Sequence, residues 1–368
     1  MSKKIAKKTI AIFTTSEGHK SIAEAIEESL QDNYQIKVFF EDIPFSKAYV
    51  ALYQFFPSLG HIPAKALNTN KNTNSLRKIA QLKYQKKINK FFAKHQPDIL
   101  INTYGIFNSC LEQLQNLTKI PLINIISDPK NPYPLVISPK AKANLTFDKK
   151  NNQFCKQYYS QAKYQSIGWF VRKRFEESYD QKKVRTKLNL DPKMLTFLIA
   201  SGSEGTNLIM KVLPTLMFPS QPVQIIVACG NNKTLFKSVN ILQSFLDKNG
   251  KHNTITPLKF TPDIHLYMQA ADLVIGKAGP NMLFETVATE TPFFAITHIS
   301  GQEDGNLEII KDYNLGYVEE NILRAQKLLK KIIEHLEILK GFENDILKMK
   351  TYNQQSKEKL LKIIAKLI

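Results

Sequence analysis

Residues Gly276 to Asn306, with the sequence GKAGPNMLFETVATETPFFAITHISGQEDGN, are the part of the chain that decides the fold. The apolar segment just before them, Ala271 to Ile275, predicts a β-strand, so Gly276 and Gly279 lie where sheet turns into helix. Glycine there permits close backbone approach and positive φ, and Pro280 suits a first helical position. The helix predicted from Asn281 to Thr289 would then present free N–H groups to an anion, and a diphosphate is the expected ligand.

Polar side chains downstream suit the rest of a nucleotide-sugar. Glu285, one turn into the helix, could accept hydrogen bonds from two ribose hydroxyls, and Gln302 and Glu303 follow on the next strand-to-helix loop. Together they offer sugar hydroxyls both donors and acceptors. The alternative is an ordinary βαβ unit whose glycines and proline only cap a helix.

This stretch resembles a known signature, that of the monogalactosyldiacylglycerol synthase and diacylglycerol glucosyltransferase family, related to the peptidoglycan N-acetylglucosaminyltransferase. The resemblance implies a two-domain GT-B fold and transfer of a sugar from UDP to a lipid. It implies that Glu285 binds ribose and that Gln302 and Glu303 hold the donor sugar. Two residues depart from the signature, because Pro280 and Glu290 stand where glycines are usual. The matching residues are Gly276, Lys277, Ala278, Gly279, Glu285, Pro292, Gly301, Gln302, Glu303 and Asn306.

Three further segments resemble the family. The first is the glycine-rich loop SGSEGT, residues 201–206, and the second is CGNN, residues 229–232; each follows a predicted strand. The third is similar to the run that opens the second domain, through Gly168, Val171, Arg172 and Phe175. The donor-binding residues expected from these segments are Arg172, Gly202, Glu204, Gly205, Gly230 and Asn231.

Alternating strands and helices favour an α/β protein with two Rossmann-like units, each with a parallel sheet. The length of 368 residues exceeds what one core usually holds. We expect an acceptor and membrane-binding domain over residues 1–170 and a UDP-sugar-binding domain over 171–350, with a hinge between Gly168 and Asn189. The last helix, residues 351–368, is expected to pack back on the first domain; an amphipathic membrane helix is the competing interpretation.

The predicted strands of the first half are Thr9 to Phe13, Ile36 to Phe40, Ile99 to Asn102 and Leu122 to Ile126. Those of the second half are Thr196 to Ala200, Val223 to Ala228, Leu273 to Ile275 and Phe293 to Ile296.

The charge of the chain is strongly positive, since 51 Lys and Arg against 32 Asp and Glu give +19. Such a field attracts nucleic acid or an anionic membrane. Residues 76–94 predict a helix with one buried and one basic face, and an aromatic patch precedes it. The resemblance implies that this region contacts the membrane and the lipid acceptor; the alternatives are a plain core helix for the aromatic residues and a solvated face for the lysines. No nucleic-acid-binding motif is evident, so we expect no nucleic-acid partner. The patch contains Tyr49, Tyr53, Phe55 and Phe56.

Other features of composition narrow the class further. Cys110, Cys155 and Cys229 lack metal-site spacing and indicate buried thiols in a reducing compartment. No apolar run reaches the length needed to span a bilayer. We therefore expect a cytoplasmic protein, peripheral on the inner face of the cell membrane, that needs no metal or other cofactor.

Two residues of the first half are candidates for catalysis. His19 follows the first strand at a helix N-terminus, which disfavours imidazolium, and the family's glycine run before this histidine is kept only as Gly18. Asp128 follows the strand Leu122 to Ile126 and resembles a family aspartate on an acceptor-facing loop, although Asp-Pro is also a common turn. Either could remove the acceptor hydroxyl proton in a single inverting displacement.

The expected function is therefore transfer of a hexose from a UDP-sugar to a membrane lipid, with diacylglycerol as the main candidate for the acceptor. One alternative is transfer from UDP-N-acetylglucosamine to an undecaprenyl-linked or other lipid. Another is a catalytically silent UDP-sugar-binding protein, and a fourth is a nucleic-acid-binding module. The oligomeric state is left open.

Overall fold

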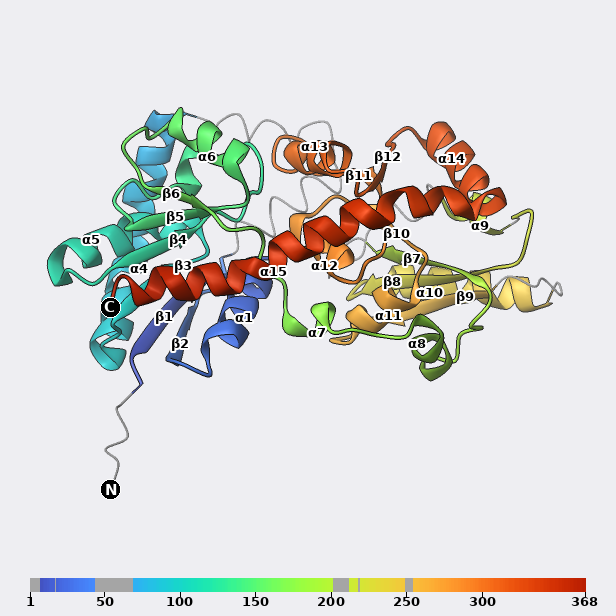
Figure 1. The fold of residues 1–368 in the computed structure, drawn as a ribbon, viewed down its shortest axis with the longest axis horizontal. Helices are drawn as coiled ribbons and strands as arrows, with labels where there is room; N and C mark the ends of the chain where they lie inside the picture. The colour runs from blue at the N-terminus through green and yellow to red at the C-terminus, as the bar shows by residue number, and fades with distance from the viewer. Residues whose placement is uncertain (1–6, 17, 44–68, 201–211, 218, 249–253) are drawn as a thin grey trace, which may run out of the picture. The chain divides into compact units, whose positions relative to one another are not determined.

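The computed structural model describes residues 7–16, 18–43, 69–200, 212–217, 219–248 and 254–368 (Figure 1). Their contacts divide the chain into two compact units. The first comprises Met1–Arg172, Ser300–Gly305 and Tyr352–Ile368, and the second comprises Lys173–Ile299 and Asn306–Thr351. Each unit has one parallel sheet with flanking helices, so the α/β prediction is confirmed.

The sheet of the first unit has six described strands in the order β2-β1-β3-β4-β5-β6. All neighbours pair in parallel, and the order reverses at β1, because β1 lies between β2 and β3. The predicted strands of this half are confirmed, whereas β5 and β6 were not predicted. The strands are β1 (Thr9–Thr14), β2 (Gln35–Phe40), β3 (Ile99–Asn102), β4 (Leu122–Ile125), β5 (Ala143–Thr146) and β6 (Tyr164–Ser166).

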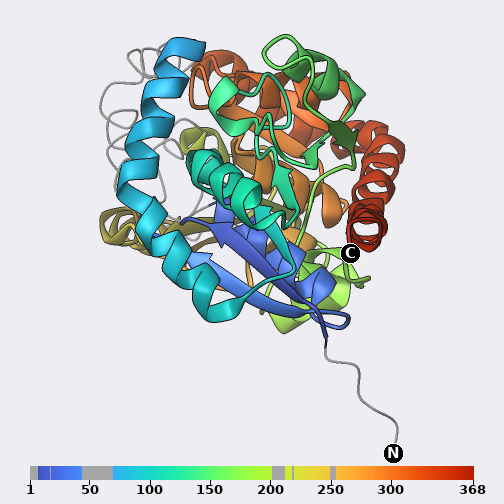
Figure 2. The ribbon, with the colours of Figure 1, turned by 90° about the vertical axis from the view of Figure 1, so that its left-hand side faces the viewer.

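Helices cover both faces of this sheet. The long helix α4 lies on the outer side of the first unit with α5 beside it (Figure 2). The helices of this unit are α1 (Gly18–Leu30), α4 (Asn70–His95), α5 (Asn108–Thr118) and α6 (Lys149–Lys156), with 3-10 turns η2 (Gly105–Phe107) and η3 (Pro134–Val136).

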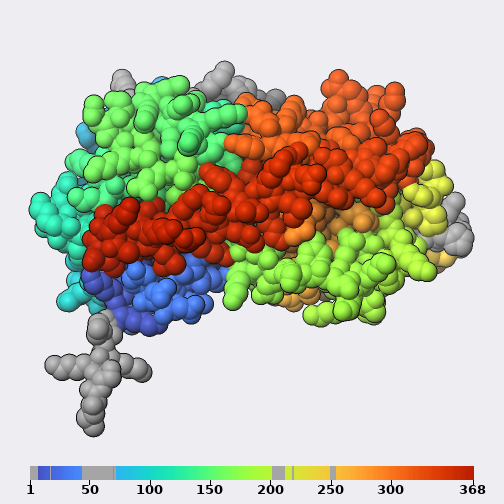
Figure 3. Space-filling model, in the orientation of Figure 1, coloured from blue at the N-terminus to red at the C-terminus, as the bar shows by residue number. Residues whose placement is uncertain are grey.

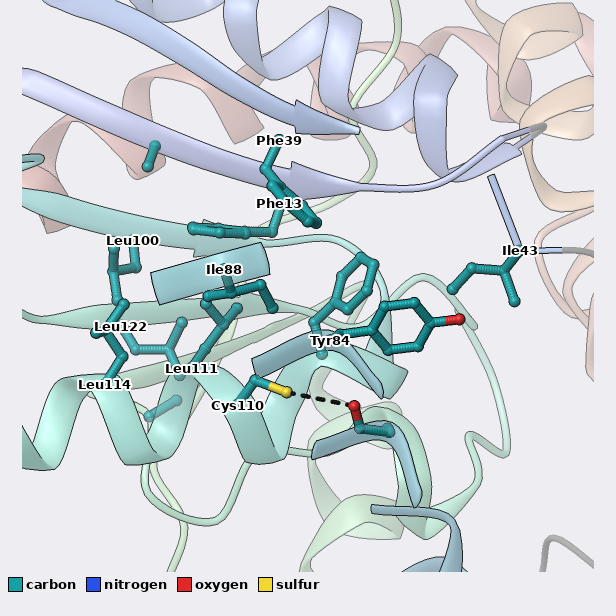
Figure 4. Packing of buried hydrophobic residues seen from close by; sticks show 14 residues of the cluster. Phe13, Phe39, Ile43, Tyr84, Ile88, Leu100, Cys110, Leu111, Leu114 and Leu122 are labelled. Carbon is teal, nitrogen blue, oxygen red and sulfur yellow. Dashed lines mark hydrogen bonds between the residues drawn. The ribbon is translucent and has the colours of Figure 1, made fainter. Parts of the chain in front are cut away.

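An aromatic core holds α4 and α5 to the sheet (Figure 4). The rings of Phe13 on β1 and Phe39 on β2 are tilted against each other with 5.5 Å between ring centres, and Tyr84 of α4 meets Phe107 of η2 edge to face, also at 5.5 Å. The Cys110 thiol donates to the carbonyl of Ala80 at 3.8 Å, where α5 crosses α4. Burying a Phe side chain contributes about 1.5–3 kcal/mol, so this cluster anchors the edge of the first unit.

A ladder of buried asparagines crosses the same sheet. Asn102, Asn124 and Asn144 occupy neighbouring positions on β3, β4 and β5 in the strand register. The Asn102 amide donates to Asn124 Oδ1 at 3.2 Å, and the Asn124 amide donates to Asn144 Oδ1 at 2.8 Å. Asn144 also accepts from the Ser138 backbone N–H at 2.9 Å, so the buried amides satisfy one another.

The sheet of the second unit likewise has six described strands, in the order β12-β11-β10-β7-β8-β9. The order reverses at β7, which lies between β10 and β8. The four predicted strands are confirmed, and β9 and β12 were not predicted. The strands are β7 (Leu195–Ala200), β8 (Val223–Gly230), β9 (Thr254–Lys259), β10 (Leu273–Lys277), β11 (Phe293–Thr297) and β12 (Gly316–Val318).

The helices of the second half are α7 (Lys173–Glu176), α8 (Gln181–Lys187), α9 (Leu213–Met217), α10 (Lys233–Lys248), α11 (Ile264–Ala270), α12 (Pro280–Ala288), α13 (Asp304–Asp312), α14 (Ile322–Glu334) and α15 (Glu343–Ala365), with the 3-10 turn η5 (Leu336–Phe342). The segment expected to act as a hinge, 168–189, therefore contains α7 and α8. Asp180 caps α8 through its carboxylate, which accepts from the N–H of Lys182 and of Lys183. This cap stabilises a short helix in a segment without apolar periodicity.

The part of α15 that belongs to the first unit begins at Tyr352, and the helix lies along the surface (Figure 3). Its inner face is buried through Asn353, Ser356, Leu360 and Ile364. Asn353 Oδ1 accepts the backbone N–H of Trp169 at 2.9 Å, so the helix is fastened to the segment that follows β6. None of the helices in the described part of the chain is long and apolar enough to cross a bilayer.

Candidate active site

The two sheets each present a reversal of strand order, at β1 in the first unit and at β7 in the second. In open parallel sheets, ligands bind beyond the carboxyl ends of the strands at such a reversal. His19 follows β1, and Lys277 to Pro280 follow or end β10, the neighbour of β7. Both groups of expected site residues therefore lie at the edges where ligand binding is expected.

The start of α12 is built by close backbone packing. A Cβ on Gly276 would lie 1.9 Å from the carbonyl oxygen of Ala200, so only glycine allows β10 to approach β7 there. Neither Gly276 nor Gly279 adopts the positive φ that glycine permits, and Gly279 has a φ of −73° and a ψ of 142°. Gly279 is instead the N-cap residue, followed by Pro280, and it has no side chain to cap the first turn. The first-turn N–H groups of α12 thus have no cap from this position.

Hydrogen bonds hold this loop in place. The Ala278 N–H donates to the carbonyl of Thr297 at 2.9 Å, and the Asn306 amide donates to the carbonyl of Ala278 at 2.7 Å. Ala278 and Asn306 are both buried. Their hydrogen bonds position the loop between Lys277 and Pro280. Asn306 therefore has a structural role in this loop, whether or not it also contacts a ligand.

Two of the remaining donor-side residues, Gly230 and Asn231, lie at the same edge of the sheet. Gly230 ends β8 with φ +55°, and Asn231 is exposed just after it. Asn232 caps α10 by accepting the N–H of Leu235 at 2.9 Å. Glu285 is buried on α12. Gly202, Glu204 and Gly205 lie outside the described residues, as do Tyr49, Tyr53, Phe55 and Phe56.

The loop that carries Gln302 and Glu303 is grouped with the first unit, as part of Ser300–Gly305. The Tyr133 hydroxyl donates to the carbonyl of Gly301, and a Cβ on Gly305 would lie 2.8 Å from the Cβ of Lys130. Gln302 is exposed, whereas Glu303 is buried. The loop therefore packs against the segment that follows Asp128.

Asp128 has an altered acidity. Burial, and secondly the negative charge of Glu303, raise the pKa of the Asp128 carboxyl to about 7. The Asn151 amide donates to the backbone carbonyl of Asp128 at 2.9 Å, which fixes the main chain there. A carboxyl that titrates near neutral pH suits proton transfer better than an ordinary, fully ionised aspartate.

His19 is held in a single ring orientation. Its Nδ1 lies 2.7 Å from the carbonyl oxygen of Thr103, which can only accept, so Nδ1 carries the proton and Nε2 has the free lone pair. The ring of Tyr104 meets it edge to face at 4.7 Å. Burial lowers the pKa of His19 to about 4, against a smaller raising effect of the Thr103 hydrogen bond. The ring is therefore neutral at physiological pH.

Arg172 pairs with an acidic residue of its own unit. Its Nη1 lies 3.4 Å from Glu24 Oε2 on α1. Within the described residues no group of three or more His, Cys, Asp and Glu side chains is arranged to hold a metal ion. Cys110, Cys155 and Cys229 are buried and free.

Two family models match the chain, one in each half. Residues 196–364 match the glycosyltransferase family 28 C-terminal domain, and residues 19–136 match monogalactosyldiacylglycerol (MGDG) synthase. The chain is a relative of the family 28 glycosyltransferases. The resemblance seen in the sequence is thereby confirmed.

Among its relatives, the processive diacylglycerol beta-glucosyltransferase of Bacillus licheniformis is 26% identical over 244 residues, which are 65% of this chain and 62% of that protein. The match thus spans about three fifths of the length of that relative. MurG of Acinetobacter baumannii superposes with a TM-score of 0.63 at 16% identity, over 98% of this chain and 99% of MurG. Anabaena HepE in complex with UDP-glucose gives 0.53 at 16% identity, over 96% of this chain and 99% of HepE. These likenesses confirm the GT-B fold.

Several residues around this candidate site had no signal in the sequence. Thr103 and Tyr104 orient His19, and Tyr133 and Lys130 contact the loop of Gln302 and Glu303. Each lies in a loop just after β3 or β4. The strand order alone could have drawn attention to them, because carboxyl-end loops of neighbouring strands meet at one edge.

Proposed function

We propose that the protein is an inverting glycosyltransferase that moves a hexose from a UDP-sugar to a membrane lipid, with diacylglycerol as the acceptor. The match to family 28 over residues 196–364 is the observation that carries this proposal. The likeness to a diacylglycerol beta-glucosyltransferase supports the lipid acceptor.

The donor diphosphate would bind at the start of α12. Nine residues of helix follow Gly279, and the aligned peptide dipoles favour a negative charge at that end. Lys277, at the end of β10, would add a positive charge. Glu285 would accept the ribose hydroxyls, and Gln302 with Glu303 would hold the hexose. HepE in complex with UDP-glucose is a solved example of such a donor on this fold.

Asp128 is the better candidate for the general base. In the proposed step its ionised carboxylate takes the proton of the acceptor hydroxyl while the hydroxyl oxygen attacks the anomeric carbon. The bond from that carbon to UDP breaks, and UDP leaves with the electron pair. A base is most effective when its pKa lies near the working pH, and the pKa of Asp128 of about 7 fits this better than the pKa of His19 of about 4.

His19 would then orient the acceptor. With Nδ1–H donated to Thr103, Nε2 is an acceptor that could bind an acceptor hydroxyl and aim it. The backbone of Thr103 is itself fixed, because its N–H donates to the carbonyl of Phe13 at 3.0 Å. Loss of His19 should therefore raise KM for the lipid more than it lowers the rate with saturating acceptor.

Membrane contact by α4 would bring the enzyme to its acceptor. Ala80, Tyr84 and Ile88 of this helix are buried, but Leu82 is 88% exposed and Ile79 is 60% exposed. Ile79 and Leu82 therefore lie on the solvent face of α4. The solvent face combines these two apolar side chains with exposed lysines, a pattern typical of a helix that lies on an anionic membrane. The lysines are Lys78, Lys83, Lys86, Lys87 and Lys90.

The reaction is proposed to need no metal, because the helix N-terminus and Lys277 would stabilise the diphosphate. The test supplies UDP-hexoses and vesicles containing diacylglycerol, in the presence of EDTA, and measures UDP release and labelled glycolipid. Transfer to diacylglycerol supports the proposal, and full dependence on added metal would contradict its metal-free form. Tight UDP binding without transfer to any lipid would indicate a silent binding protein instead.

The donor site has its own test. Glu285→Ala should weaken UDP binding by titration calorimetry about tenfold to a hundredfold, the loss expected for a buried charged hydrogen-bond acceptor of about 1.5–3 kcal/mol. Glu308→Ala, on α13, is the matched control and should bind UDP normally. Unchanged UDP binding in the Glu285 variant would remove the ribose assignment.

A further inference from the structure

The second unit carries an exposed face of its own on α10. Ile241 is 72% exposed and Phe245 is 51% exposed, although the opposite face of the same helix is buried through Leu235, Val239 and Leu246. At about 100° of rotation per residue, Lys237, Ile241, Phe245 and Lys248 fall within an arc of about 80°. We call these four residues the α10 stripe. It places two large apolar side chains between two lysines on the solvent side.

Further apolar and basic side chains stand where the sheet ends beside α10. β9, the edge strand, packs beside α10 (Figure 1), and Lys259 Nζ lies 5.1 Å from the ring centre of Phe236. Phe260 follows at once and is 61% exposed. Lys233 stands in the first turn of α10. Asp247 is the one acid on α10, against three lysines.

The charges of this surface are not neutralised locally. Within the described part of the chain, Lys233, Lys237 and Lys248 form no ion pair. Lysine stems can lie along an apolar layer while their ammonium groups remain in water beside phosphates. An apolar centre with a cationic border therefore matches the boundary of an anionic bilayer.

We propose that the α10 stripe is a membrane-contact surface on the UDP-sugar-binding half of the chain, and that its partner is an anionic lipid bilayer. A second copy of the chain fits less well, since a two-fold interface through the stripe would bring like charges together. Strand addition at β9 is also disfavoured, because Pro257 in this edge strand has no N–H to donate. The inference goes beyond the proposed function, since binding of α10 to lipid does not require sugar transfer.

Vesicle binding by the full chain tests the proposal. Ile241→Ser combined with Phe245→Ser should lower partitioning onto phosphatidylcholine vesicles containing phosphatidylglycerol by about tenfold, because two apolar side chains lose their place in the boundary layer. Lys237→Gln combined with Lys248→Gln should lower it mainly at low salt. The matched control is Ile322→Ser with Leu323→Ser on α14, which removes two exposed apolar side chains that adjoin the acids Glu319 and Glu320. This control should bind the vesicles normally.

A fluorescent probe locates the contact. The natural cysteines are buried, so an environment-sensitive thiol dye would label Phe245→Cys selectively. Addition of anionic vesicles should shift its emission to the blue, whereas the same dye on Leu323→Cys should stay unchanged. Equal vesicle binding by the stripe variant, or no shift at position 245, overturns the proposal. If the emission is already shifted to the blue without lipid and light scattering detects a dimer, the stripe binds a second copy of the chain, and the membrane proposal is overturned.

The vesicle-binding test of the α10 stripe can succeed or fail independently of the sugar-transfer test of the proposed function. Transfer to diacylglycerol in detergent micelles should not depend on the stripe. If transfer fails with every lipid but vesicle binding depends on Ile241 and Phe245, the proposed function falls and this inference stands.

Discussion

The carboxyl groups of Asp128 and Glu303 interact electrostatically, although 175 positions separate them in the sequence. The negative charge of Glu303 is the second cause, after burial, of the raised pKa of Asp128. Both residues belong to the first unit, because Ser300–Gly305 packs with it. A residue expected to hold the donor sugar thus tunes the residue proposed to take the acceptor proton.

Glu303→Gln should shift the pH dependence of sugar transfer. Removing this charge lowers the pKa of Asp128, so the carboxylate ionises at lower pH and the acidic limb of kcat/KM, expected near pH 7, moves down. The measurement is the pH at the midpoint of the acidic limb. The absolute rate is not used, because it also falls if Glu303 binds the sugar. Glu308→Gln should leave the midpoint unchanged. If the midpoint of the acidic limb does not move in Glu303→Gln, the charge of Glu303 does not affect the pKa of Asp128.

Asp128→Asn should abolish transfer and stabilise the fold at high pH. The pKa of Asp128 rises from 3.8 to about 7 on folding, so between these values the folded chain holds a proton that the unfolded chain has lost. The free energy of unfolding therefore falls as pH rises through this window, and the amide removes that loss. We expect a gain on the order of 2 kcal/mol at pH 8 and little at pH 4, measured by urea unfolding. An equal gain at both pH values would contradict the assignment.

Gly276→Ala should be strongly destabilising. Its Cβ would lie 1.9 Å from the carbonyl oxygen of Ala200, and since that atom is backbone, β10 and β7 must separate. We expect a loss of about 3 kcal/mol in the free energy of unfolding, with weakened UDP binding. Gly341→Ala is the control, because nothing lies within 4 Å of a Cβ there. Similar stability of the two variants would refute this packing.

Glu290→Gly should increase stability. Glu290 has φ +60°, a conformation that costs a residue with a side chain about 1 kcal/mol, and it stands where the family usually has glycine. The ion pair with Lys350 that is lost with it, at 2.6 Å, joins a carboxylate that is 44% exposed to a lysine side chain that is 11% exposed, so its loss offsets part of the gain. We expect a gain of about 0.5 kcal/mol by urea unfolding. Glu290→Ala keeps the strain and loses the pair, so it should be less stable than the natural chain.

The fold could be predicted where strands are long and apolar. Four strands are buried on both faces, namely β1, β7, β8 and β11, and their continuous hydrophobic sequences predict a parallel sheet. The four strands that escaped prediction are short or polar. β6 is YQS and β12 is GYV, and they are strands only because a neighbouring strand pairs with them.

Of the candidate site, only the course of the backbone could be predicted from the sequence. The glycines, Pro280 and Glu285 are contiguous in the sequence, so their spacing reveals a strand, a turn and a helix. The environment of His19 depends on Thr103, 84 residues away, and no local pattern specifies that hydrogen bond. The distinction between a neutral histidine and a titrating aspartate arises from burial, which the sequence near either residue does not reveal.

The asparagine ladder gives the first sheet a fixed alignment. Hydrophobic side chains on β3, β4 and β5 could exchange partners at modest cost, but a shift of one strand by a single residue would leave buried amides unpaired, at about 1–3 kcal/mol for each. Thr103 directly follows Asn102, and Asp128 comes four positions after Asn124. The amides that fix the strand register therefore also fix where Thr103, which binds His19, and Asp128, the candidate base, lie beyond the carboxyl ends of β3 and β4.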